Sequence, residues 1–413
     1  RSTSAKHRER QVTNLLINNK MSLPNVNIVI GNGNMGQIAL SDDGIAGLVL
    51  TGTAVSKKLD LNKVYVLSGT TDFKKLGIEQ DTNPLLHKEL TAFYATAGEG
   101  AELHLIVVSE ATTLTQMCAT AEDSPLKKLV GSAAGRIRLV GINRNPPAEY
   151  SPTVENGLDT DVQTAIQAAQ NVAESFLSQL APFRLFLPAI GWNGDTSDLY
   201  QPRQGSYNRV AVVLASDGKF GSSKLYSAAI GQVLGRAAKI SVHQNLGRVR
   251  SGAIAGDGFL TDGKTPREHY GHWPQLDDAG YIFYRSFVGK NGYYLNGDAM
   301  ATAVSDDYCF LSSGRVIDKA MVIAYQTYID DILDNIQVDA KDGTISTPVC
   351  KGYEANIIRA VNTGMAGEIS SFSAYINPKQ NVLANGRMDI TCTIVPLATL
   401  REITVNLSLK NPA

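Results

Sequence analysis

Apolar and β-branched residues form short, nearly uninterrupted runs through the first two thirds of the chain. Four of these runs have the length of a β-strand and hold few polar side chains. They are residues 103–109, 136–142, 183–190 and 209–215. Each run therefore predicts a β-strand. Their alternation with helical segments predicts a mostly parallel or mixed sheet with helices on its faces.

Segments with helical periodicity separate these runs. In residues 160–180, apolar side chains recur every three or four positions, with Asp159 or Thr160 as the expected N-cap and Pro182 as the stop. Residues 222–239 repeat this pattern. Both segments are long enough to cross one face of the predicted sheet.

A further helix is predicted from an asparagine and a proline in sequence. Asn83 suits the N-cap, Pro84 suits the first turn, and Gly98 suits the position after the last turn. Strands that alternate with helices in this way indicate an α/β fold. We therefore expect an α/β body that spans residues 45–275.

The last third of the chain has a different pattern. Residues 250–280 are rich in Gly, Asp and Pro and have no sustained period, which favours a domain boundary near residue 276. Beyond it, helical segments and strand-like runs predict an α+β domain over residues 276–400. The expected strands are 281–288, 369–375, 387–395 and 402–409, and the expected helices are 315–336 and 349–361.

Both ends of the chain are expected to be extended arms. Residues 21–44 hold a strand-like run that leads into a glycine-rich turn. In residues 401–413, aliphatic and polar side chains alternate, so a strand there is free to pair outside its own domain. Residues 1–20 are basic and lack the apolar core of a signal peptide, and we expect a leader or upstream sequence outside the fold.

The charge balance and the composition exclude several classes of protein. The 413 residues include 38 Lys and Arg against 39 Asp and Glu, for a net charge of −1. This neutrality argues against a nucleic-acid partner, because binding to phosphates requires clustered cations. A hydrophobic content of 43% argues against intrinsic disorder. The longest apolar stretches, 45–55 and 185–192, are far shorter than the roughly 20 residues of a membrane span, so no membrane insertion is expected.

One glycine motif could indicate a nucleotide site. Gly31, Gly33 and Gly36 fit the pattern G-x-G-x-x-G and follow the strand-like run 26–30. A dinucleotide site also requires a helix directly afterwards and an acidic residue about 20 positions later. The next residues are rich in turn formers, and 51–56 contain no acid. We interpret the motif as a flexible turn and expect no cofactor.

A second cluster could indicate a metal site. His269 and His272 are followed by Asp277 and Asp278, and imidazoles and carboxylates are suitable ligands. However, the segment is a loop rich in Gly and Pro that has no helix to fix the geometry, and no third histidine is near. We therefore expect no metal at these residues.

Two further groups of charged residues have simple explanations. A solvated helix face accounts for the acidic group, and surface or interface positions account for the basic group, which lacks interleaved aromatics. The acidic group is Asp330, Asp331 and Asp334, and the basic group is Arg136, Arg138, Arg248 and Arg250. The sequence also contains no G-x-S-x-G elbow and no P-loop lysine, so we do not expect an enzyme.

Several segments, taken in order, resemble the tail sheath proteins of contractile phages and related injection systems. They include an N-terminal Leu-Pro run, an apolar segment that closes in a glycine, a helix that ends at Gly98, a tyrosine-rich segment, and a final strand, proline and strand. These segments are 23–29, 44–52, 66–77, 92–98, 279–292, 297–302 and 390–405. Residues 110–260 are similar only in their α/β character.

The resemblance implies a structural subunit. Sheath subunits form stacked six-fold rings around a tail tube, so the implied partners are further copies of this chain, the tube protein, and baseplate and tail terminator proteins. The implied location is the virion tail, with assembly in the bacterial host cytoplasm. Sheath arms add strands to neighbouring subunits by β-augmentation. The subunit-linking residues are then expected to be Val26, Ile28, Ile30, Ile403, Val405, Leu407 and Leu409.

Two alternatives stay open at the level of sequence. An α/β enzyme of unknown substrate would be stabilised by its ligand. Another phage structural protein, such as a capsid or baseplate component, would use the same strand exchange and would differ mainly in the geometry of its assembly.

Overall fold

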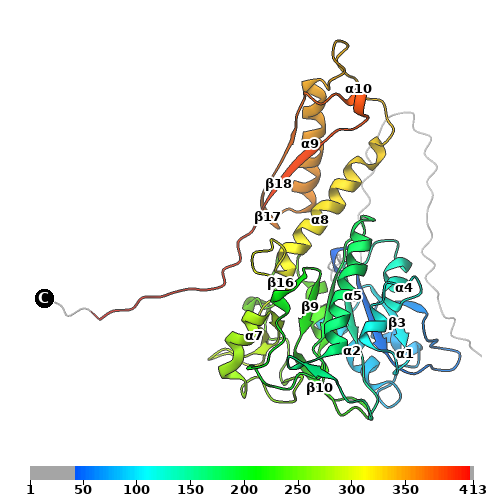
Figure 1. Cartoon of the computed structure of the whole chain (residues 1–413), viewed down its shortest axis with the longest axis vertical. Helices are drawn as coiled ribbons and strands as arrows, with labels where there is room; N and C mark the ends of the chain where they lie inside the picture. Colours follow the sequence, from blue (N-terminus) through cyan, green and yellow to red (C-terminus); the bar gives the residue numbers. More distant parts are fainter. Residues whose placement is uncertain (1–41, 410–413) are drawn as a thin grey trace, which may run out of the picture. The chain divides into compact units, whose positions relative to one another are not determined.

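The computed structural model describes residues 42–409, and its largest sheet has seven strands (Figure 1). In chain order they are β1 (Ala46–Thr51), β2 (Val64–Leu67), β3 (Leu103–Val108), β4 (Leu139–Asn143), β7 (Arg184–Pro188), β9 (Val210–Val213) and β13 (Tyr281–Ile282). In space they follow the order β13-β9-β7-β4-β1-β3-β2, and all neighbours are parallel except β2 and β3. The expected mostly parallel sheet is confirmed.

Helices cover both faces of this sheet. They are α1 (Thr70–Lys75), α2 (Pro84–Ala97), α3 (Leu114–Met117), α4 (Pro125–Ser132), α5 (Thr160–Leu177), α6 (Ile230–Lys239) and α7 (Trp273–Ala279). Along β1, Val49 joins the hydrophobic cluster of α3, α4, α5 and α7, whereas Leu48 and Leu50 join the cluster of α1, α2 and α6. This alternation is the ordinary consequence of strand geometry, and it explains why the strands are apolar throughout.

Helix α6 lies directly against α2 because two glycines leave room for the α2 backbone. A Cβ atom on Gly231 would collide with the carbonyl oxygen of Glu89, and one on Gly235 would lie 2.7 Å from the carbonyl oxygen of Phe93. The glycines are four residues apart, as are the two carbonyls that they face. One ridge of each helix therefore follows the other.

The predicted helix ends in the body are largely confirmed. Asn83 is the N-cap of α2, with Pro84 in its first turn and Gly98 at its C-cap. Asp159 is the N-cap of α5, and its carboxylate accepts the backbone N–H of Asp161 at 3.1 Å. Helix α5 ends at Leu177, before the proline that was expected to stop it.

Short strands and single 3-10 turns make up the other elements outside the main sheet. The strands are β5 (Val154–Glu155), β6 (Leu158–Asp159), β8 (Ser206–Tyr207), β10 (Ala215–Gly218), β11 (Ser227–Ala228), β12 (Phe259–Leu260), β14 (Tyr284–Arg285), β15 (Tyr294–Leu295) and β16 (Ala301–Thr302). The 3-10 helices are Asp42–Gly44, Pro202–Gln204, Val249–Ser251, Tyr270–His272 and Ile329–Asp331.

The C-terminal part has its own small core. It consists of α8 (Leu311–Tyr328), α9 (Thr347–Gly364), β17 (Ile369–Ile376), α10 (Val382–Asn385) and β18 (Ile390–Pro396) (Figure 1). Helix α9 packs against both α8 and β17. The buried residues of this core are Val242, Val316, Ala320, Ile357, Val361 and Met365. The expected α+β ending is confirmed.

Three further predicted helices have other bounds, and one of them, 349–361, is only lengthened to Thr347–Gly364. The segment 222–239 becomes helical only at Ile230, because Ser227–Ala228 pairs with β10 as strand β11. The segment 315–336 is helical over Leu311–Tyr328 and then tightens into a 3-10 turn. Its start is stabilised by Asp298, whose carboxylate accepts the backbone N–H of Ser312 at 2.9 Å. Periodicity within the helix does not reveal such a distant partner.

The strand expected at 281–288 is broken. Phe283 separates β13 from β14, because its backbone N–H and carbonyl both bond to Asn296. Strand β13 pairs with β9 of the main sheet, and β16 pairs with β8. The α/β body therefore extends to at least residue 302, past the boundary expected at 276. Within residues 42–409, no helix is long and apolar enough to cross a membrane.

Candidate subunit interface

The C-terminal part contains a two-stranded sheet with open edges. Strands β17 and β18 pair antiparallel over seven residue pairs, from Ile369 and Pro396 to Ile376 and Ile390. Within the described part of the chain, neither strand has a second neighbour. A two-stranded sheet is marginally stable alone, and an open edge presents N–H and C=O groups that can pair with another strand. The sheet is thus suited to accept strands from outside.

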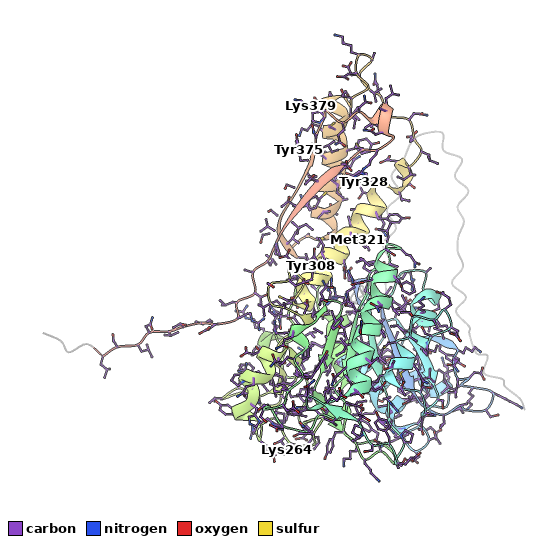
Figure 2. All side chains as sticks on the ribbon, in the orientation of Figure 1. Lys264, Tyr308, Met321, Tyr328, Tyr375 and Lys379 are labelled. Carbon is purple, nitrogen blue, oxygen red and sulfur yellow. The ribbon has the colours of Figure 1, made fainter. Side chains whose placement is uncertain are left out.

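The two faces of this sheet differ in chemistry. Phe372, Ala374 and Ile394 point inward and pack on the core formed with α8 and α9. The outer face carries mainly small polar residues, and Tyr375 and Val395 are also exposed there (Figure 2 labels Tyr375). A strand added at either edge would therefore extend an inner face that is apolar and an outer face that is mainly polar.

A groove of about 670 Å³ lies between α8 and the inner face of β18. Its apolar lining on α8 comes from Val316, Ile317 and Met321, and that on the sheet includes Phe372 and Ile394. Figure 2 labels Met321 on α8 and Tyr308 just before it, both of which line the groove. Apolar surface of this kind beside an open strand edge is typical of a binding groove for a peptide segment.

The segment after β18 exposes a row of aliphatic side chains. Residues 397–409 form neither helix nor strand, so the strand expected at 402–409 is not formed within the subunit. Four residues expected to link subunits lie here: Ile403, Val405, Leu407 and Leu409 are 73%, 68%, 91% and 105% exposed. Isolated surface aliphatics are normal, whereas contiguous exposed apolar surface is typical of interaction sites. The other three, Val26, Ile28 and Ile30, lie outside the described residues.

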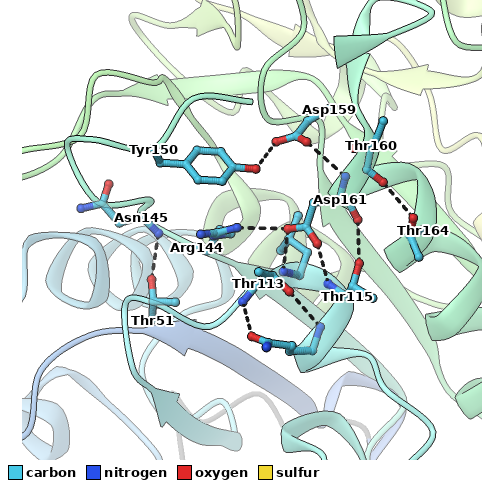
Figure 3. Close-up of polar contacts among 12 residues, drawn as sticks. Thr51, Thr113, Thr115, Arg144, Asn145, Tyr150, Asp159, Thr160, Asp161 and Thr164 are labelled. Carbon is cyan, nitrogen blue, oxygen red and sulfur yellow. Dashed lines mark hydrogen bonds and ion pairs between the residues drawn. The ribbon is translucent and has the colours of Figure 1, made fainter. Parts of the chain in front are cut away.

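Part of the edge of the main sheet where α/β enzymes bind ligands is occupied by internal contacts (Figure 3). Ligands of open α/β sheets bind at the carboxyl ends of the strands. There, the Asp161 carboxylate accepts the backbone N–H groups of Leu114 and Thr115 at 2.8 and 3.0 Å and pairs with Arg144 at 3.0 Å. The backbone N–H of Asn145 donates to Thr51 Oγ1 at 2.8 Å. These polar groups hold α3, α5 and the loop after β4 together.

A buried ion-pair group joins α8 to the main sheet. Asp318 on α8 accepts Nε of Arg184 at 2.9 Å and Nη2 of Arg209 at 2.9 Å. Burial raises the pKa of Asp318, but the two guanidinium groups outweigh it and hold that pKa below its ordinary value. A Cβ atom on Gly314 would overlap the guanidinium of Arg184, which explains a glycine inside this helix. This group was not predicted from the sequence, although arginines that open apolar strands are a detectable signal.

The histidines considered for a metal do not converge with the aspartates that follow them. His269 is buried, its Nε2 lies 2.7 Å from Asp262, and its Nδ1 lies 3.2 Å from Nδ1 of His272. Asp277 instead accepts the side-chain amide of Asn296 at 2.7 Å. No group of three or more potential metal ligands occurs among residues 42–409. The glycine motif at 31–36 lies outside this range.

The other charged groups lie as follows. Asp330 and Asp331 are exposed in the 3-10 turn after α8, and Asp334 is exposed beyond it. All three are solvated, as expected, but none lies on the face of an α-helix. Arg136 is exposed and forms an ion pair with Glu102, whereas Arg138 is half-buried. Arg248 and Arg250 are both exposed, at the N-cap and in the middle of a 3-10 turn.

Comparison with protein families decides the affiliation of the chain. The profile described as "DUF2586, N-terminal domain" matches residues 23–299, which is more than half of the chain. The chain belongs to the DUF2586 family. A second profile, "DUF2586, C-terminal domain", matches residues 307–413. The junction of these two DUF2586 domains lies just before α8, beyond the boundary expected near residue 276. No curated protein sequence matches the chain.

The DUF2586 chain has the fold of contractile sheath proteins. It matches the contracted helical sheath of the anti-feeding prophage with a TM-score of 0.62 and 14% identity, over 94% of this chain and 99% of that one. A chain of the six-fold symmetrised baseplate of the anti-feeding prophage gives 0.58 and 14%, with 94% and 99% covered. A sheath tail protein from Desulfitobacterium hafniense gives 0.51 and 10%, with 90% and 100% covered.

Proposed function

We propose that this chain is the structural subunit of a contractile tail sheath, in a phage or a related injection system. Copies polymerise helically around a tail tube, and contraction of the lattice drives the tube through a target cell envelope. The observation that carries this proposal is the likeness to a contracted sheath subunit over 94% of the chain. Heterologous contacts that do not close into a single ring generate such helical assemblies.

The open edges of the β17–β18 sheet are the proposed sites of linkage. Residues 402–409 of one subunit add as a strand beside β18 of a neighbour, and their aliphatic side chains cover the groove lined by Ile317 and Met321. Main-chain hydrogen bonds supply strength, and the alternating side chains set the register. Val26, Ile28 and Ile30 are the proposed contributors to the second open edge.

The remaining partners follow from this role. We propose that the lattice contacts a tail tube protein inside and baseplate and tail terminator proteins at its ends. The assembled protein then belongs to the tail of a virion or of a virion-like particle, and it is built in the bacterial host cytoplasm. The role requires neither a cofactor nor a catalytic residue.

A baseplate-associated ring is the second candidate. The fold likeness to a chain in the anti-feeding prophage baseplate favours it. It predicts closed rings of fixed size rather than cylinders of variable length. An enzyme is less well supported, because Asp161 and Arg144 at the carboxyl edge of the main sheet are paired with each other.

Electron microscopy of the purified full chain in negative stain tests the proposal. Hollow, striated cylinders of variable length support a sheath, isolated rings favour the second candidate, and monodisperse particles at every concentration contradict both. A chain that lacks residues 402–413 is the matched control. It should remain folded, since residues 402–409 are exposed and contribute no side chain to the core, but it should not polymerise.

A further inference from the structure

Lys319 on α8 lies between two carboxylates from distant parts of the chain. Its Nζ lies 2.7 Å from Asp43 and 2.7 Å from Glu368, and the three side chains are 16%, 19% and 13% exposed. Burial lowers the pKa of Lys319, but the two carboxylates outweigh it and hold that pKa above its ordinary value. The ammonium group is therefore charged at neutral pH. Asp43 lies at the end of the expected N-terminal arm, residues 21–44, and Glu368 directly precedes β17.

Residues next to Asp43 are held from two further directions. Arg315 on α8 is buried and donates from Nη2 to the carbonyl oxygen of Asp43 at 3.2 Å and to that of Ile240 at 3.4 Å. A Cβ atom on Gly44 would collide with the carbonyl oxygen of Ala238 at the end of α6. The point at which the N-terminal arm meets the folded body is therefore tightly defined.

The C-terminal arm is tied down in a similar way. The guanidinium of Arg401 lies 4.3 Å above the ring of Phe310 and 3.6 Å from the carboxylate of Asp277. Phe310 is the N-cap residue of α8. The exposed aliphatic row begins at Ile403, only two residues after this contact. Stacking of an arginine on an aromatic ring combines a cation–π attraction with packing.

We propose that α8 is the common anchor of both subunit-linking arms, with Lys319 and Arg401 as its positioning residues. This inference rests on the proposed function, because it concerns a chain whose arms link subunits. Tension between neighbours enters at Asp43 and Arg401 and passes along α8. The buried pairs of Asp318 with Arg184 and Arg209 keep α8 attached to the body. The directions in which the arms leave the body then stay constant while the subunits move.

Matched lysine variants test this anchor in the full chain. Lys319→Met keeps the length of the side chain and removes its charge, Lys319→Arg keeps the charge, and Lys290→Met removes an exposed lysine that has no ion pair. Arg401→Lys keeps the charge at the second anchor but removes the planar group over Phe310. Thermal melts report on folding, hydrogen exchange of residues 42–46 reports on the N-terminal anchor, and electron microscopy reports on the axial repeat of the cylinders.

The anchor predicts a specific combination of results. In Lys319→Met, the backbone amides of residues 42–46 should exchange their hydrogens faster than in the wild type. The critical concentration for assembly should rise by roughly three- to tenfold, and the distribution of the axial repeat among cylinders should broaden. Lys319→Arg should restore these values, and Lys290→Met should equal the wild type. Arg401→Lys should broaden the axial repeat with unchanged exchange at 42–46.

Three outcomes would overturn the inference. If Lys319→Met and Arg401→Lys form cylinders with the wild-type repeat and critical concentration, α8 does not anchor the arms. If Lys319→Met melts much earlier and Lys319→Arg does not restore the repeat, the lysine serves folding alone. If the wild-type chain itself forms no cylinders, the proposed function fails and the inference fails with it, and that result is distinct from a failure confined to the variants.

Discussion

At the scale of single residues, Asp217 on β10 is a carboxylate in unfavourable surroundings. Both of its oxygens are buried and have no hydrogen-bond partner among the described residues. Burial raises the pKa of Asp217 to about 7, although Lys88 opposes the shift. Glu89 lies nearby in α2, and burial together with the charge of Asp217 raises the pKa of Glu89 well above its ordinary value. The two carboxyl groups therefore titrate as a pair.

This pair predicts an unusual dependence of stability on pH. Between pH 4 and pH 7, roughly, the folded chain retains protons that the unfolded chain releases, so the free energy of unfolding should fall as the pH rises. At pH 8, Asp217→Asn should raise it by about 2–4 kcal/mol, because one pKa unit corresponds to about 1.4 kcal/mol. Urea denaturation at pH 5 and pH 8 measures the effect. The exposed Asp278→Asn variant is the control, and equal pH slopes in both variants would contradict the prediction.

At the scale of elements, the close contact of α2 and α6 depends on what glycine lacks. A Cβ atom on Gly235 would meet the backbone of α2 at Phe93, whereas one on Gly131, on the exposed side of α4, would meet no atom within 4 Å. Both glycines lie inside helices, where alanine is intrinsically preferred by about 0.5–1 kcal/mol. Packing and helix propensity therefore act in opposite directions at Gly235 and in the same direction at Gly131.

Substitution of glycine by alanine should thus have opposite effects on the free energy of unfolding in the two helices. We expect Gly235→Ala to lower the free energy of unfolding by about 1–3 kcal/mol, because the extra methyl group forces α6 away from α2. Gly131→Ala should raise it by about 0.5–1 kcal/mol. Chemical denaturation of both variants at one pH measures the difference. If both substitutions stabilise the chain, the close approach of α2 and α6 is not required.

At the scale of the whole molecule, assembly should depend on the register of the C-terminal arm. In residues 402–409, Ile403, Val405, Leu407 and Leu409 share one side of an extended strand. Arg401 holds the start of this segment on Phe310. An insertion just after Arg401 therefore shifts the side chains of the arm without disturbing its anchor.

One inserted alanine between Arg401 and Glu402 should abolish polymerisation, and two should restore it in part. A single insertion turns the aliphatic side chains away from the groove of the neighbour. It thereby removes about four contacts that are each worth roughly 1.5–3 kcal/mol when fully buried. Sedimentation of the assembled fraction measures the outcome. Equal assembly of both insertion variants would show that the arm is not specific in register.

The sequence by itself determined the elements whose causes are local. Runs of apolar residues identified the strands β3, β4, β7 and β9, because both of their faces are buried. Asn83 with Pro84, and Asp159, marked the starts of α2 and α5, because a cap depends on residues within one turn. The alternation in residues 402–409 is likewise visible without a structure.

Only the tertiary structure decided which distant groups meet. The start of α8 depends on Asp298, and the break in the strand after Tyr281 depends on Asn296, neither of which lies within the segment concerned. The pairing of Arg184 with Asp318, and of Lys319 with Asp43 and Glu368, joins residues far apart along the chain. The reason is physical: a local pattern reports burial and backbone preference, whereas the partner of a charge depends on which surfaces the folded chain brings together.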